Sequence, residues 1–305
     1  MPVTDKKIYQ FSLKLGLPRE SALNLILVKR GLKDATTINY SKKICAFLKK
    51  NQYKFEIDES YLKEKVHGFL EYTTKVPLFD APLIKRLYVG KKISRAGLKQ
   101  LKSGTNFDQG LAFGFPICDV LNYCKKSKKE GKSYIDIFKD WLSDLPDNDG
   151  FKFLDFRFFG GLVKYFRDIR IIVHIPHSPD CIQSLEMADR NLSILKELDS
   201  SFYETLIYEF TRPLLIYGDR WRSFSMIQFD GIEKLGTGRY RGRCLKAINS
   251  KVAANTELDI KLLPHKKVEI FLKDKKVDKS TSSASIPWSY VFLVATGTQP
   301  GSFLI

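Results

Sequence analysis

The sequence predicts an α+β fold with an N-terminal helical region, a mixed central core and a C-terminal sheet that is mainly antiparallel. Apolar residues recur at helical spacing early in the chain, whereas short candidate strands follow one another after about residue 212. Strict alternation of strands and helices, typical of a doubly wound sheet, is scarce. With a linker-like stretch over residues 75–82, we expect a helical region over 1–76 and an α+β core over 77–305.

Three helices are expected in the N-terminal region. The first follows Pro18 and ends at Gly31, a favourable C-terminal cap, and the second covers residues 40–48. Residues 58–60 introduce a third, because apolar side chains between residues 62 and 70 lie at helical spacing. Short helices in a basic chain are compatible with a DNA-binding helix-turn-helix motif or with a packed helical layer that does not bind DNA. We favour the helical layer.

The central core contains two segments in which a turn leads into a helix. Residues 107–124 predict a helix pair broken at residues 114–116, with the second helix starting at the proline of that break. An apolar strand over residues 169–175 precedes a further helix. Ser178 is a good N-cap for this helix, and Pro179 suits its first position.

Strand candidates dominate the C-terminal part. They are residues 213–217, 223–229, 268–272 and 290–294. Residues 236–243 are rich in glycine and arginine and superficially resemble a phosphate-binding loop. No helical pattern follows them, so we interpret them as a basic hairpin turn.

Composition favours a cytoplasmic protein with a polyanionic partner. The 305 residues carry a net charge of +17, which favours association with nucleic acid, although lysine-rich surfaces also serve solubility alone. No stretch approaches the roughly 18–20 apolar residues of a membrane span, and no secretory signal is recognisable. Five widely spaced cysteines, an odd number, argue against a disulfide framework and for reduced thiols.

The residues with the richest chemistry lie at the two predicted helix starts. Cys118 and Asp119 follow the break at residues 114–116, and the segment 174–181 supplies two histidines and a cysteine. Both cysteines are expected in a first helical turn, where free N–H groups favour a thiolate. If the two helix starts converge, the combined ligand set is Cys118, Asp119, His177 and Cys181. His174 is a further, less favoured candidate ligand.

Residues 87–90, 114–120 and 174–181 together resemble an uncharacterised protein family. Its pattern is Gly-Tyr-Pro-x-Cys-Cys-Val followed by His-x-Pro-Cys-Ser-x-Asp-Cys, and it implies no established activity. This chain has Asp119 in place of the second adjacent cysteine and His177 in place of the cysteine before the serine. Zinc accepts both replacements, whereas an iron–sulfur cluster prefers four thiolates. A decayed site that leaves only a scaffold is the alternative.

Two other interpretations of these residues stay open. Cys181 could act as a metal-free nucleophile, with His177 as base and Asp180 or Asp119 orienting the imidazole. The cysteines could also be ordinary core residues, because a buried free cysteine behaves as a small hydrophobe.

Basic clusters interleaved with aromatic residues suggest contacts to phosphates and bases. The candidates are Lys85, Arg86, Lys91, Lys92, Arg95, Arg220, Arg222, Arg239, Arg241 and Arg243. Our leading hypothesis is a zinc-binding cytoplasmic protein, which could be an enzyme acting on a nucleic acid or a nucleotide-like anion. The alternatives are a non-catalytic nucleic-acid-binding protein and a scaffold with a degenerate site.

Overall fold

The computed structural model confirms the α+β class and divides the chain into two compact units. The first comprises Met1–Ser143 and Arg167–Tyr203, and the second comprises residues 144–166 and 204–305. The expected boundary near residue 76 stays a prediction, because residues 74–82 are not described. The structure describes residues 4–66, 69–73, 83–132, 134–145, 147–148, 151–158, 169–217, 225–248, 250, 252–263, 267–272, 275–279 and 290–296.

The first two predicted helices are confirmed, and a further one precedes them. The two predicted helices are α2 (Arg19–Arg30) and α3 (Lys42–Lys50), and the additional helix is α1 (Asp5–Lys14). Gly31 ends α2 in the left-handed conformation with a φ of 74°, as its place in the sequence predicts. The Ser41 hydroxyl accepts a hydrogen bond from the Ile44 N–H and caps α3.

The third predicted helix is wrong, because residues 58–66 belong to strand β2 (Lys54–Val66) and residues 69–70 belong to strand β3 (Phe69–Thr73). β2 pairs antiparallel with β4 (Leu83–Gly90), and β4 also pairs with β1 (Ala35–Asn39). The four-stranded sheet has the order β1-β4-β2-β3. Pairing along the length of β2 outweighs the helical spacing of its apolar residues.

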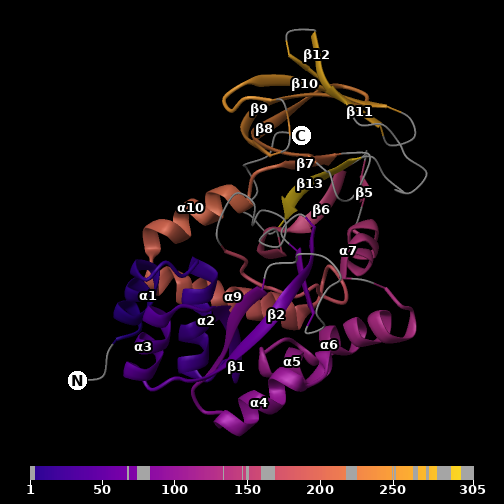
Figure 1. The fold of residues 1–305 in the computed structure, drawn as a ribbon. Helices are drawn as coiled ribbons and strands as arrows, with labels where there is room; N and C mark the ends of the chain where they lie inside the picture. The colour runs from indigo at the N-terminus through magenta and orange to yellow at the C-terminus, as the bar shows by residue number, and fades with distance from the viewer. Residues whose placement is uncertain are drawn as a thin grey trace. The chain divides into compact units, whose positions relative to one another are not determined.

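The predicted helix pair at residues 107–124 is confirmed as α5 (Asn106–Ala112) and α6 (Ile117–Cys124). It follows α4 (Arg95–Ser103) and continues into a π-helical turn, η1 (Lys125–Lys129), and then α7 (Tyr134–Ser143). Figure 1 shows α4, α5 and α6 in succession in magenta. The buried side chains of Ala35, Tyr88, Leu98 and Leu101 pack with Phe113 and hold this layer on the sheet.

The predicted strand at residues 169–175 is wrong, because residues 169–181 have no regular secondary structure. Side-chain contacts, rather than pairing with a neighbouring strand, hold this segment in place. The Asn191 amide donates to the Ile171 carbonyl at 2.8 Å, and Arg170 pairs with Glu20 at 2.8 Å. The following helix, α9 (Ile182–Leu198), has Cys181 as its N-cap residue, three residues later than the predicted cap at Ser178.

The second unit contains a nine-stranded sheet and confirms the predicted β-rich character. The chain enters it through α10 (Ser200–Phe210), and a 3₁₀ turn, η2 (Phe156–Phe158), follows β6. The sheet order is β12-β11-β10-β9-β8-β7-β13-β6-β5, antiparallel except for the β13–β6 pair. Its strands are β5 (Asp147–Asn148), β6 (Phe151–Asp155), β7 (Leu214–Tyr217), β8 (Ser225–Gly236), β9 (Arg239–Ile248), β10 (Glu257–Leu263), β11 (Lys267–Leu272), β12 (Lys275–Lys279) and β13 (Tyr290–Thr296).

The predicted basic hairpin turn is confirmed, since β8 and β9 pair antiparallel and Thr237 and Gly238 form the turn. Buried Tyr217, Phe229 and Tyr240 contribute to the core of this unit. Within the described part of the chain, no helix combines the length and apolar character needed to cross a membrane.

Candidate metal centre

The structure brings the predicted ligand set together within the first unit. Cys118 and Asp119 lie in the first turn of α6, as predicted, while His177 lies in the irregular segment and Cys181 immediately precedes α9. One potential ligand atom from each of the four residues lies within 4.8 Å of the others. Two segments about 60 residues apart therefore supply one compact group of sulfur, oxygen and nitrogen atoms.

The two sulfur atoms are close enough to contact one metal ion. The Sγ atoms of Cys118 and Cys181 are 3.8 Å apart. Two thiolates bound tetrahedrally to zinc, each at about 2.3 Å from the ion, are about 3.8 Å apart. Asp119 Oδ1 lies 3.7 Å from Cys118 Sγ, and Asp119 Oδ2 lies 3.8 Å from Cys181 Sγ. The carboxylate therefore faces both thiols without closing the space between them.

Asp119 organises the centre through hydrogen bonds. Its side chain is 1% exposed, and Oδ1 accepts from the backbone N–H of His177 at 2.7 Å. The Nδ1 atom of His177 lies 2.7 Å from the same oxygen. Oδ2 accepts from the Ser184 hydroxyl at 2.5 Å and faces Nε2 of His174 at 2.9 Å. These contacts tie α6, the irregular segment and α9 to one carboxylate.

The hydrogen bonds keep this buried carboxylate ionised. Burial by itself raises the pKa of Asp119. Hydrogen bonds from His174, Ser184 and the His177 backbone outweigh burial, so the pKa of Asp119 is held well below its usual range. A negative charge is therefore present at the centre at neutral pH, as binding of a cation requires.

His174, the less favoured candidate ligand of the sequence analysis, lies outside the group of four. Its side chain is 6% exposed and burial lowers its pKa, although Asp119 acts in the opposite direction. Nε2 carries the proton because it faces the ionised carboxylate. The Nδ1 atom is buried and has no hydrogen-bond partner among the described residues. His174 therefore contacts Asp119 from outside the group of four.

The prediction that both cysteines are thiolates is wrong for Cys118. Burial, the carboxylate of Asp119 and the neighbouring Cys181 raise the pKa of Cys118 to about 12. Burial, together with the nearby negative charge, outweighs the effect of the helix N-terminus. Cys118 is therefore protonated at pH 7.

The geometry also bears on the interpretation of Cys181 as a metal-free nucleophile. Of the two carboxylates considered as the orienting group, Asp119 is the one that lies within hydrogen-bond distance of a His177 ring nitrogen. The side chain of His177 is 39% exposed, whereas Cys181 is buried. A buried sulfur is poorly placed to attack a substrate, so the geometry favours a ligand role for Cys181.

Two residues at the centre escaped the sequence analysis. Ser184 and Gln183 both lie in the first turn of α9, and the Gln183 Oε1 atom lies 3.4 Å from Cys118 Sγ. Ser184 follows Cys181 by three residues, a spacing that places two side chains on the same face of a helix. This spacing was the signal available in the sequence.

Gly114 forms the turn through which the chain enters α6. We expect Gly114→Ala to destabilise the first unit by about 1–2 kcal/mol. Its φ is 75°, and a Cβ atom there would lie 2.9 Å from the Leu32 carbonyl oxygen. Gly131→Ala is the matched control, because Gly131 has a φ of 62° but open space around its Cα. Urea unfolding should show the larger loss for Gly114→Ala, and equal losses would contradict this role.

The basic residues predicted to bind phosphate are divided between the two units. In the first unit, Lys85 pairs with Glu59 and Arg86 pairs with Asp58. Lys91 lies over the ring of Tyr53 and donates to the Asn51 carbonyl. The other two candidates of this unit, Lys92 and Arg95, are exposed.

In the second unit, Arg241 pairs with Asp259 and Glu257, while Arg239 and Arg243 are exposed on β9. The remaining candidates, Arg220 and Arg222, lie outside the described residues. Carboxylates thus already neutralise three of the predicted phosphate ligands, Lys85, Arg86 and Arg241, which weakens the case for them.

Comparisons of the chain with protein-family models, curated proteins and solved structures return no match. The resemblance to the uncharacterised family therefore stays a prediction. The geometry of the four clustered residues is the basis on which a function can be proposed.

Proposed function

We propose that the protein binds one zinc ion through Cys118, Asp119, His177 and Cys181. The observation that carries the proposal is the convergence of these four residues, including the 3.8 Å separation of the two sulfur atoms. Two sulfurs, one imidazole and one carboxylate suit zinc, whereas calcium and magnesium prefer oxygen ligands alone. All five cysteines are free thiols, which is compatible with the cytoplasmic location that we also propose.

Zinc would bind in place of protons that now form hydrogen bonds between the ligand residues. The 2.7 Å contact between His177 Nδ1 and Asp119 Oδ1 is a hydrogen bond. Zinc-bound nitrogen and oxygen atoms are about 3.3 Å apart in a tetrahedron, so the two side chains separate by about half an ångström on binding. His177 is exposed and can make this adjustment without disturbing the core.

The centre has features of both a structural and a catalytic site. Four protein ligands would make a closed, structural zinc site, whereas coordination without Asp119 would leave a position at which zinc could activate a water molecule. Asp119 can leave the metal without becoming unpaired, because His174, Ser184 and the His177 backbone hold it. We propose on this basis that the protein is an enzyme with zinc-activated water.

Elemental analysis of the purified protein tests metal binding directly. We expect about one zinc per chain in the wild type and none in Cys118→Ala/Cys181→Ala. The matched control is Cys45→Ala/Cys244→Ala, which removes two thiols outside the group of four and should retain zinc. Wild-type protein purified without chelators that contains no zinc and takes up none would overturn the proposal.

Zinc binding at pH 7 should release protons. Cys118 is protonated in the metal-free protein because its pKa is about 12, and zinc binds the thiolate. Calorimetric titrations in buffers of different ionisation enthalpy should report the release of at least about one proton per zinc. Cys118→Ser should reduce that number, and binding without proton release would contradict the assignment of Cys118 as a ligand.

A second candidate function, nucleic-acid binding, is favoured by one observation in the second unit. A cavity of about 260 Å³ there is lined by two cations, Arg239 and Lys261, and two aromatic residues, Tyr240 and Phe271, together with one carboxylate, Asp259, and the apolar residues Leu235 and Ile260. Arg239→Ala/Arg243→Ala should then weaken binding to single-stranded RNA or DNA and lower its salt dependence. Binding that is absent at low salt would exclude this candidate.

A further inference from the structure

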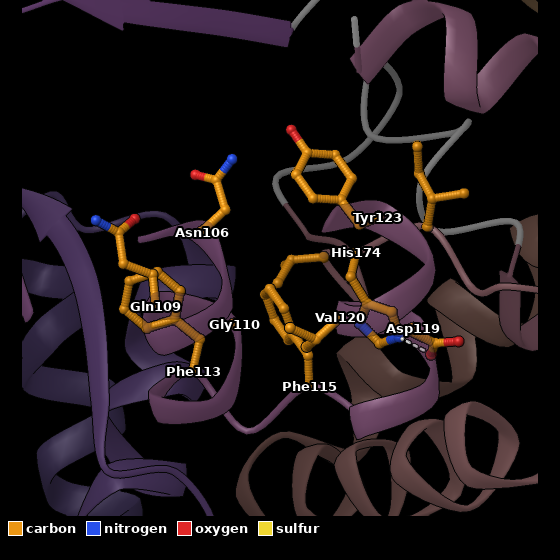
Figure 2. A pocket seen from close by; sticks show the side chains of 11 residues that line it. Asn106, Gln109, Gly110, Phe113, Phe115, Asp119, Val120, Tyr123 and His174 are labelled. Carbon is orange, nitrogen blue, oxygen red and sulfur yellow. Dashed lines mark hydrogen bonds and ion pairs between the residues drawn. The ribbon is translucent and has the colours of Figure 1, made fainter. Parts of the chain in front are cut away.

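A partly enclosed cavity of about 190 Å³ adjoins the metal centre in the first unit (Figure 2). The helices α5 and α6 and the irregular segment 173–175 form its walls. Asp119 and His174 belong both to its lining and to the metal centre or its support. A molecule in the cavity would therefore lie beside the carboxylate that faces the metal.

The lining of the cavity is largely apolar and aromatic. Figure 2 shows Phe113, Phe115 and Tyr123 around it, with the amides of two polar residues, Asn106 and Gln109, at one end. Among the described residues that line it, none is lysine or arginine. Because no cation is present to balance a phosphate, the lining disfavours an anionic ligand.

A buried ring nitrogen without a hydrogen-bond partner belongs to a residue of the same wall. Nδ1 of His174 is on the ring edge turned away from Asp119, and it has no partner among the described residues. The Phe115 ring covers the imidazole, with ring centres 4.8 Å apart. A buried polar atom without a partner indicates a missing water or ligand. A ligand that shifts Phe115 can donate an N–H or O–H group to this nitrogen.

We propose that the cavity binds a neutral, planar heterocycle of one or two rings that donates a hydrogen bond to His174 Nδ1. The size is appropriate, because an apolar cavity of about 150 Å³ holds benzene. Aromatic walls stack on such rings. The assignment of this cavity as the substrate site of the zinc centre rests on the proposed function. Binding of the heterocycle itself does not need the metal.

Indole and benzofuran are matched probes, because they have the same shape and differ in the N–H group. Titration of methyl-labelled protein followed by NMR should give a Kd for indole below about 1 mM and binding of benzofuran about tenfold weaker. The methyl signals of Val120, Val173 and Ile175 should shift, and those of exposed Leu111 on α5 should not. Val173→Phe, which fills the cavity, should abolish binding, whereas Leu111→Phe should retain it.

The outcomes separate this inference from the zinc proposal. If indole does not bind, or if it shifts signals outside the cavity, the inference is wrong, whatever the zinc content. If the two probes bind equally, the role of His174 Nδ1 is wrong. Indole that changes zinc affinity severalfold, and zinc that changes indole affinity equally, supports a shared site through Asp119. Binding without such coupling overturns the assignment as the substrate site of the zinc centre.

Discussion

Cys181→Ser is expected to weaken zinc binding by at least about 100-fold. Loss of a residue that only supports a metal ligand already costs about 10–100-fold, and loss of a thiolate ligand costs more. Cys181 is buried between Cys118 and Asp119, at 3.8 Å from each of them, so no other thiol can replace it without movement of α9. Competition with a chromophoric chelator measures the affinity of each variant.

Cys124→Ser is the matched control for this change. Cys124 is half-buried at the end of the same helix, α6, and does not belong to the group of four. Its replacement should leave the zinc affinity within about twofold of the wild type, since distant surface changes have small effects. Equal losses for the two variants would show that zinc binding depends on general stability rather than on Cys181.

Asp119→Ala should destabilise the metal-free protein by about 3–5 kcal/mol, the usual cost of removing one partner of a buried charged network. The change removes the acceptor that serves the His177 backbone, Ser184 and His174, and leaves these donors buried. Hydrogen exchange read on peptides that cover α6 and the start of α9 gives the local free energy of opening.

Two variants make this test specific. Asp119→Asn keeps the size and one acceptor oxygen, so it should cost less than Asp119→Ala but still abolish tight zinc binding. Asp180→Ala removes an exposed carboxylate four residues from Ser184 and should change the free energy by less than about 0.5 kcal/mol. A loss for Asp119→Ala no larger than that of Asp180→Ala would contradict the organising role of Asp119.

The pH dependence of stability follows from the same carboxylate. Because the folded pKa of Asp119 lies below its unfolded value, the unfolded state binds the proton more tightly. The contribution of Asp119 to stability is therefore complete above its ordinary pKa, about 3.9, and is lost as the pH falls toward the lower folded value. Asp119→Asn should lack this acid-dependent part in urea titrations between about pH 5 and pH 3.

The sequence predicted the four residues that the structure brings together, but not Gln183 and Ser184 beside them or the chemistry of the group. The turn at Gly114 and Pro116 identifies the start of α6, and residues 174–181 concentrate three potential ligands in one short segment. That the two segments meet in space does not follow from either local pattern. The raised pKa of Cys118 depends on burial of the thiol and on Asp119 and Cys181 beside it, and helix position alone predicts the opposite.

The two errors in secondary structure have one physical cause. Residues 62–70 have helical spacing and residues 169–175 form an apolar run, yet the described residues of the first segment lie in β2 and β3 and the second segment is irregular. In both, partners distant in the sequence decide the outcome: β4 pairs with β2, and Asn191 holds the Ile171 carbonyl. Local patterns cannot report such partners.

X-ray absorption at the zinc edge is the sharpest test of the metal centre. We predict two sulfur neighbours at about 2.3 Å and two nitrogen or oxygen neighbours at about 2.0–2.1 Å in the wild type. Cys181→Ser, loaded with excess zinc, should show at most one sulfur. A spectrum of the wild type with only nitrogen and oxygen neighbours would contradict the assignment of Cys118 and Cys181 as the ligands.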